Sequence, residues 1–102
     1  MKLIDCTRML RSKNAGPLWL TMDLGFETEE VMQQVLQSGV LNAATIAKLY
    51  DVDERMVRII PYPVVNAIKI TVPRSVPSGA LTDSDIYGCQ QHMALANLEV
   101  TL

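Results

Sequence analysis

Residues 18–26 read LWLTMDLGF. From Leu18 onward every second residue is a large apolar one, while the positions between them include Thr21 and Asp23. Successive side chains of a strand point to opposite faces, so this alternation predicts a strand with one fully apolar face. Such a strand belongs against a hydrophobic core, and the rest of the chain must supply that core.

Two helices are predicted to follow this strand. Residues 27–38 begin with acidic side chains, which favour the positive end of a helix dipole, and continue with an apolar stripe. Gly39 suits the position after that helix, where a left-handed backbone is common. Asn42 is a good N-cap for the second helix, and Leu41 and Ile46 have the spacing of a hydrophobic staple.

Three further strands complete the predicted sheet, at residues 56–60, 67–72 and 98–102. The prolines of Pro61-Tyr62-Pro63 cannot donate ladder hydrogen bonds, so a turn or a sheet edge is expected there. The order of elements predicts an α+β fold, a ferredoxin-like sandwich whose four-stranded, mainly antiparallel sheet carries two helices on one face. The second crossover is predicted to be long and mostly irregular, with room for a short helix over 90–96.

The 102 residues are enough for a single domain and too few for two. Within it, the segment 4–10 is expected to form a short helix or a simple lead-in. The turn formers of residues 11–17 predict a loop. The predicted divisions are 1–17 (lead-in and polar loop), 18–72 (strand-helix-helix-strand-strand), 73–97 (long polar loop) and 98–102 (final strand).

Composition excludes several classes of function. A net charge of −2 and a pI near 5.2 argue against nucleic-acid binding, which needs a basic face. No apolar run is long enough to cross a membrane, and the first residues turn polar too soon for a signal peptide. Cys6 and Cys89 are expected to be reduced thiols in a cytoplasmic protein. The 49% of hydrophobic residues leaves some apolar surface for an interface, and Trp19 and Tyr62 are candidates for it.

The first candidate site is the predicted loop Arg11-Ser12-Lys13-Asn14. Two cations beside small residues and exposed backbone N–H groups are suited to hold a carboxylate or a phosphate. The alternative is a solvated loop whose Asn14 and Gly16 serve only its backbone angles.

The second candidate site lies in the segment that begins at Pro73. We expect Arg74, Ser78, Gln90 and Gln91 to contact the substrate, and His92, Asp85 and Tyr87 to act in catalysis. His92 would serve as a general acid or base, oriented by Asp83 or Asp85. The alternative is a surface histidine beside a turn capped by Asp83. The sequence predicts neither a metal site nor a cofactor, because His92 has no ligand-spaced companion.

Several motifs in order along the chain carry a resemblance to a known family. They are Arg11 to Pro17 with Thr21 and Asp23, Ser38 to Leu41 with Ile46-Ala47 and Leu49-Tyr50, Ala67-Ile68-Lys69 with Pro73-Arg74, and Ser78-Gly79, Asp83, Asp85, Tyr87-Gly88 and Gln90 to His92. Together they resemble domain-of-unknown-function family 4387 over almost the whole chain. The resemblance implies a small protein that partners, or is fused to, a larger protein similar to the acyclic terpene utilisation protein A type.

Three hypotheses of function follow. The first is an accessory subunit of a two-component catabolic enzyme that acts on an organic acid or a CoA thioester, with hydration or dehydration as the reaction. In it, Arg11, Lys13 and Arg74 bind a small anionic substrate. The second is a non-catalytic domain that stabilises the larger partner. The third is a self-contained homo-oligomeric enzyme.

Overall fold

The strand predicted from residues 18–26 occupies the interior of the sheet as β2 (Trp19–Gly25). The computed structural model describes residues 1–16, 18–74 and 93–100. In these residues the sheet has the order β1-β2-β4-β3, and each neighbouring pair is antiparallel. Its other strands are β1 (Met9–Asn14), β3 (Arg58–Tyr62) and β4 (Ala67–Pro73). β2 and β3 therefore run parallel on either side of β4, which is the split βαβ arrangement of a ferredoxin-like fold.

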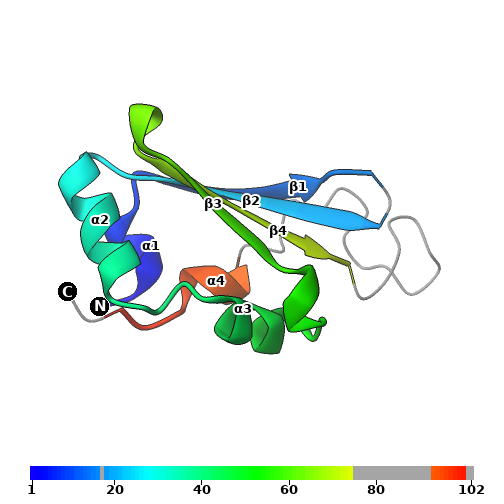
Figure 1. The fold of residues 1–102 in the computed structure, drawn as a ribbon. Coiled ribbons are helices and arrows are strands. Elements are labelled where there is room, and N and C mark those ends of the chain that lie inside the picture. Colours follow the sequence, from blue (N-terminus) through cyan, green and yellow to red (C-terminus); the bar gives the residue numbers. More distant parts are fainter. Residues whose placement is uncertain (17, 75–92, 101–102) are drawn as a thin grey trace.

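The described helices lie on one side of this sheet (Figure 1). The crossover from β2 to β3 contains α2 (Glu29–Gln37), α3 (Ala43–Tyr50) and the 3₁₀ turn η1 (Glu54–Met56). Two short helices, α1 (Leu3–Cys6) and α4 (Met93–Ala96), complete the layer, and the 3₁₀ turn η2 (Pro63–Val65) joins β3 to β4. The α+β, ferredoxin-like prediction is confirmed.

The signals at the helix ends work as the sequence predicts. The Asn42 side chain accepts a hydrogen bond of 2.8 Å from the backbone N–H of Thr45, which caps α3. Gly39 has a φ of 76° just beyond α2, a conformation that favours glycine. α2 itself starts slightly later than expected, because Thr28 caps it by accepting from the N–H of Val31 at 3.2 Å.

The core lies between the helices and the inward face of the sheet. In β2 and the residue after it, the inward side chains are 2% exposed or less, as are those of β4. These side chains are Leu20, Met22, Leu24, Phe26, Ile68, Ile70 and Val72. α2 adds Met32 and Val35, and α3 adds Ile46. Leu18 departs from the predicted stripe, because it lies before β2 begins and is 54% exposed.

The loop predicted for residues 11–17 is wrong, because most of it is strand β1. All six residues of β1 pair with β2, from Met9 opposite Gly25 to Asn14 opposite Leu20. The turn is shorter than predicted and is closed by a 3.0 Å hydrogen bond from the N–H of Ala15 to the carbonyl of Trp19. Polar residues of low strand propensity form a strand here because β2 offers them a complete ladder of partners.

The prediction of a final strand at residues 98–102 also needs correction. Within residues 98–100 the structure has only an isolated bridge between Glu99 and Lys2, and residues 101–102 lie outside the described part. The edge position beside β2 is held by β1. Val100 still points inward as predicted and is 2% exposed. Its N–H bonds the carbonyl of Met1 at 2.8 Å, so this segment fastens the two ends of the described chain together.

The cap at Asn42 gives a first prediction. Replacing Asn42 by alanine leaves the N–H of Thr45 without its partner and should lower the free energy of unfolding by about 1 kcal/mol. Asn42→Asp keeps an acceptor and should change it by less than half as much. Urea denaturation followed by circular dichroism measures both, and equal losses in the two variants would contradict the capping role.

A second prediction concerns Tyr50, at the end of α3. Burial raises the pKa of its phenol to about 12, and a hydrogen bond with the backbone of Leu95 in α4 partly opposes that rise. The neutral phenol is thus favoured in the folded state, and its contribution to stability is complete below the ordinary pKa of 10. As the pH rises from 10 towards 12, the unfolded state loses this proton first, so stability should fall. Tyr50→Phe should show a shallower fall in urea titrations, and parallel slopes in both proteins would refute the assignment.

Candidate anion-binding site

The strand register places rows of side chains across the face of the sheet that the helices leave uncovered, here called the open face. Each row contains one residue from each of β1, β2, β4 and β3, in that order. The first row is Met9, Gly25, Ala67 and Tyr62. The second row is Arg11, Asp23, Lys69 and Ile60. The third row is Lys13, Thr21, Thr71 and Arg58.

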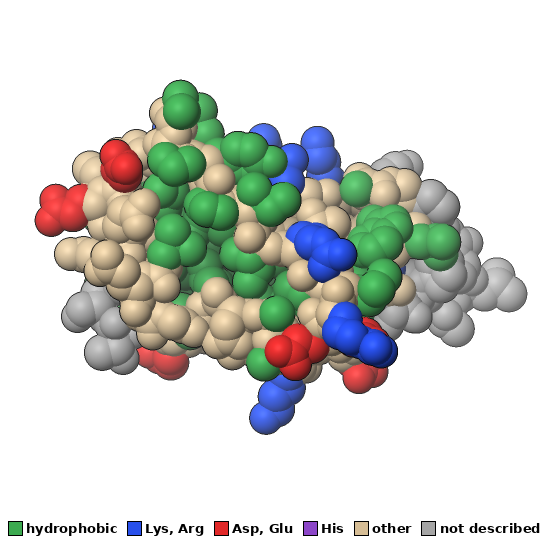
Figure 2. All heavy atoms as spheres, viewed as in Figure 1, with side chains coloured by type: hydrophobic (Ala, Val, Ile, Leu, Met, Phe, Trp, Pro, Cys, Tyr) green, Lys and Arg blue, Asp and Glu red, His purple; other side chains and the backbone are tan. Residues whose placement is uncertain are grey.

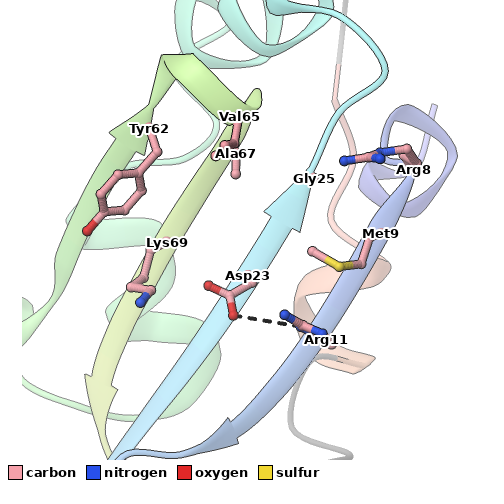
Figure 3. A pocket seen from close by; sticks show the side chains of 9 residues that line it. All are labelled: Arg8, Met9, Arg11, Asp23, Gly25, Tyr62, Val65, Ala67 and Lys69. Carbon is pink, nitrogen blue, oxygen red and sulfur yellow. Dashed lines mark ion pairs between the residues drawn. The ribbon is translucent and has the colours of Figure 1, made fainter.

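The first two rows enclose a hollow of about 300 Å³ that is open to solvent (Figure 3). Its floor is formed by Gly25 and Ala67, the smallest side chains of the first row. Met9 rises on the β1 side, and Tyr62 and Val65 rise on the β3 side. Arg8, Arg11, Asp23 and Lys69 complete the lining. The hollow exists because two neighbouring central strands carry almost no side chain at this level.

Gly25 is the residue that keeps the floor low. A Cβ atom at this position would lie 3.4 Å from Met9 Cε and 3.7 Å from an Arg8 guanidinium nitrogen. An added methyl group would therefore fit at ordinary contact distance, but it would occupy the space between those two side chains. The hollow depends on glycine for its volume and not for an unusual backbone angle.

The charge of the hollow is opposite to that of the chain. Its lining holds three cations, Arg8, Arg11 and Lys69, and one carboxylate, Asp23, so it carries a net +2, while the whole chain carries −2. Arg11 Nε lies 3.8 Å from Asp23 Oδ2, a long contact for an ion pair. The Arg11 side chain is 67% exposed, so water screens this pair strongly. The cationic excess therefore remains available to an incoming anion.

Tyr62 and Lys69 form the corner of the hollow on the β3 side. The ammonium nitrogen of Lys69 lies 6.0 Å from the centre of the Tyr62 ring, at the outer limit of a cation–π contact. The ring itself is on a residue that is 44% exposed. The corner thus presents a flat apolar surface and a positive charge side by side.

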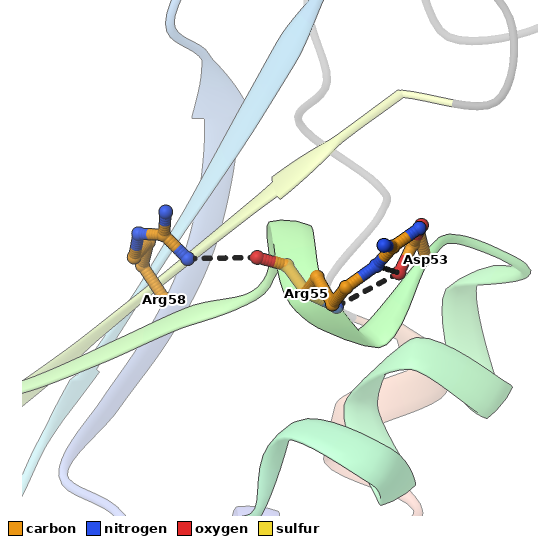
Figure 4. A network of polar contacts seen from close by, with 3 residues as sticks. All are labelled: Asp53, Arg55 and Arg58. Atoms are coloured by element: carbon orange, nitrogen blue, oxygen red, sulfur yellow. Dashed lines mark hydrogen bonds and ion pairs between the residues drawn. The ribbon is translucent and has the colours of Figure 1, made fainter.

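Arg58 shares the open face by register but is drawn away from the hollow (Figure 4). Its guanidinium donates to the carbonyl of Arg55 at 3.0 Å and to that of Val57 at 3.3 Å. Arg55 in turn donates to both carboxylate oxygens of Asp53, and these hydrogen bonds lower the pKa of Asp53 to about 2. This exposed network holds the start of β3. Arg58 is engaged in it, and the cations that line the hollow are Arg8, Arg11 and Lys69.

The residues of the predicted anion-binding loop lie on two different faces of the sheet, because they form strand β1 and not a loop. Arg11 and Lys13 lie on the open face, whereas Ser12 and Asn14 point to the helix side, opposite Met22 and Leu20. Ser12 is only 5% exposed. Arg74 donates to the side-chain oxygen of Asn14 at 2.6 Å, so it belongs with the helix-side pair. The predicted grouping of Arg11, Lys13 and Arg74 around one anion is therefore not what the structure brings together.

The other predicted site residues lie outside the described part of the chain. They are Ser78, Asp83, Asp85, Tyr87, Gln90, Gln91 and His92. Among the residues that the structure describes, no cluster of three His, Cys, Asp or Glu side chains is suited to hold a metal ion. The one cysteine in the described ranges, Cys6, is buried, and burial raises the pKa of its thiol.

The sequence reasoning missed most of the hollow. Arg8, Lys69 and Gly25 were not recognised as site residues, and Tyr62 was considered only as a contact for a partner protein. The available signal was the outward position of each strand, because residues that alternate with a buried stripe share the opposite face. Several residues that carry the family resemblance meet on this face: Arg11, Lys13, Thr21, Asp23, Ala67 and Lys69.

The fold and the hollow define a small ferredoxin-like α+β domain with a cationic open sheet face. The chain belongs to the family described as domain of unknown function DUF4387, whose model matches residues 3–99. No curated protein and no solved structure matches the chain. Within the described residues, no helix has the length and apolar character needed to span a membrane.

The weak Arg11–Asp23 pair gives a third prediction. Because the contact is long and exposed, Arg11→Gln and Asp23→Asn should each change the free energy of unfolding by less than about 1 kcal/mol. Urea denaturation of both single variants and of the double variant measures the coupling. A coupling well above 1 kcal/mol would mean that the pair is a structural element and that the hollow is built for stability.

Proposed function

We propose that this protein binds a small organic anion in the hollow of its open face and does so as the smaller subunit of a two-component enzyme. The observation that carries the proposal is the local net charge of +2 in a solvent-open hollow on a chain whose net charge is −2. Cations that face one space without matching carboxylates repel one another, and a bound anion relieves that repulsion.

The openness of the hollow supports the role of a subunit. Sites for small molecules usually bury about 70–90% of the ligand surface, and a hollow open on one side leaves much of a ligand in water. A second protein that covers the open face would complete the enclosure. We propose a larger protein similar to the acyclic terpene utilisation protein A type in this position.

The β3 edge offers a surface for that partner. Exposed apolar side chains run from the strand into η2, where Val64 is 97% exposed. The set, here called the β3 patch, is Ile60, Tyr62, Val64 and Val65. Figure 2 shows apolar side chains across this side of the molecule, with cationic side chains along its upper margin. Tyr62 and Val65 belong to both the β3 patch and the hollow, so a partner seated on the patch would also cover the ligand.

The chemistry of the hollow suits an organic acid that carries a hydroxyl group. Arg8, Arg11 and Lys69 attract the carboxylate, and Asp23 supplies an acceptor for a hydroxyl donor. This is the pattern expected for hydration or dehydration of an organic acid or its thioester. The proton transfer itself would fall to His92, Asp85 and Tyr87, or to the larger subunit.

A non-catalytic stabilising domain is the second candidate, and the β3 patch alone favours it. The two candidates differ in what the open-face cations do. In a stabilising domain, neutralising Lys69 and Arg11 leaves the partner's activity intact as long as the two chains bind. In a shared site, the complex forms but loses activity.

The fourth prediction tests anion binding with succinate, a dianion without a hydroxyl group. Because each charge in the hollow acts on the ligand at a few ångströms in partly screened surroundings, Lys69→Gln should weaken binding by about three- to tenfold. Asp23→Asn raises the local charge to +3 and should strengthen binding by a similar factor. Amide chemical-shift changes in NMR titrations measure the dissociation constants.

Lys48→Gln is the matched control, because it removes the same charge from the last turn of α3, outside the hollow. It should leave the dissociation constant within about a factor of two of the unmodified protein. Equal affinities in the Lys69→Gln, Asp23→Asn and Lys48→Gln proteins would contradict an anion site in the hollow. A tagged chain that retrieves no large partner from its native extract would contradict the subunit role.

A further inference from the structure

The hollow contains a mostly apolar row and a charged row next to it, with the Arg8 guanidinium beside the Gly25 end of the apolar row. Met9, Gly25, Ala67 and Tyr62 form the first row, and the second begins with Arg11, Asp23 and Lys69. Residues two apart in a strand are separated by roughly 7 Å. A ligand that spans both rows must therefore change from apolar to anionic over about that distance.

The first row offers surfaces that suit a flat group. Its floor is formed by Gly25, which is buried with the Met9 side chain against it, and by the single methyl group of Ala67. Tyr62 lies on the β3 side, where its ring extends toward Lys69, and the Met9 thioether lies on the β1 side (Figure 3). Aromatic rings and thioethers both favour contact with another π-system. A planar group fits this combination better than a branched or puckered one, because its face can lie against the ring or the thioether at contact distance.

The cationic residues also favour a planar ligand. Lys69 lies 6.0 Å from the Tyr62 ring centre, so an anionic group beside it remains next to the ring. Arg8 borders the Gly25 end of the first row, 3.7 Å from where a Cβ of residue 25 would lie. A guanidinium is itself planar and stacks on flat groups. A compact anion such as succinate would use the cations and leave the Tyr62 and Met9 surfaces uncovered.

We propose that the ligand of the hollow is an anion with a planar conjugated or aromatic group, seated over Gly25 and Ala67 beside Tyr62, with its anionic group at the Arg11–Lys69 row. This inference rests on the proposed function, since it specifies the ligand of the same site. It makes Gly25 and Tyr62 the residues that determine specificity. Neither carries a charge, so the argument from the net charge of the hollow did not single them out.

The fifth prediction compares three probes by NMR titration of the whole chain. Cinnamate is flat and carries its carboxylate beyond a conjugated linker, cyclohexylpropanoate has the same charge and similar length but a puckered ring, and succinate is compact. Cinnamate should bind about three- to tenfold more tightly than cyclohexylpropanoate, the increment of an aromatic contact. Equal affinities for the two ring-bearing probes would overturn the inference.

Two variants test whether Gly25 and Tyr62 produce the preference for cinnamate. Gly25→Ala places a methyl group on the floor at ordinary contact distance from Met9, so the fold should persist while cinnamate affinity falls several-fold. Tyr62→Leu keeps an apolar side chain and removes the ring, and it should remove most of the preference for cinnamate over cyclohexylpropanoate. Succinate affinity should fall less than cinnamate affinity in both, because succinate relies on the cations of the hollow more than on Gly25 and Tyr62. Thr21→Val is the control, because it changes a β2 residue of the open face outside the hollow.

The outcomes separate this inference from the proposed function. If succinate and cinnamate bind with equal affinity and Gly25→Ala has no effect, the planar-ligand inference fails while anion binding stands. If no probe produces shifts at the open face, both fail.

Adenosine monophosphate, titrated in parallel, distinguishes a nucleotide from a carboxylate as the planar anion. Tighter binding than cinnamate, with the same dependence on Tyr62, identifies a nucleotide, and weaker binding identifies a carboxylate.

Discussion

The register of β2 is the constraint on which the rest of the structure depends. β2 is paired along its length with both β1 and β4, so every cross-strand row in the sheet passes through it. Its side chains point alternately to the core, where they are large and apolar, and to the open face, which includes Asp23 and Gly25. A slip of one residue would turn Asp23 into the core and expose Met22, an exchange that burial energetics forbid. The hollow is therefore fixed by the same alternation that builds the core.

That coupling explains how a small domain can present a site without enclosing it. One face of the sheet is used entirely for stability, with helices packed over residues such as Met22 and Ile70. The other face carries no helix among the described residues. The types of residue on it are therefore governed by solvent, charge and contact with other molecules. On this face, the small residues Gly25 and Ala67 open a hollow and the neighbouring row surrounds it with charge. The β3 patch continues from the hollow along the sheet edge, which links ligand binding and partner binding in one surface.

Much of the fold was predictable because its signals are local. Alternation identified β2 and β4, and side-chain chemistry identified the caps at Asn42 and Gly39. The prediction failed where polar residues fold against a strong neighbour: β1 has no apolar alternation of its own and forms because β2 pairs with it. It failed again at residues 98–100, whose alternation is real but serves to bury Val100 beside the N-terminal segment. Of the predicted site, Arg11 lies in the hollow, while Ser12 and Asn14, predicted in the same loop, lie on the helix side of the sheet.

The sequence by itself determined which strands have one buried face, where α2 ends and α3 begins, and that cations lie near the amino end of β2. Those properties depend on neighbours within a few positions, so a single chain displays them. Only the tertiary structure decided that Arg11, Asp23 and Lys69 form one row and that Gly25, Ala67 and Tyr62 form the next. These residues are far apart in the chain, and they meet because the order β1-β2-β4-β3 brings non-consecutive strands together. Alternation determines which face each residue takes. Which residues stand opposite one another across non-consecutive strands is decided only when those strands pack into one sheet.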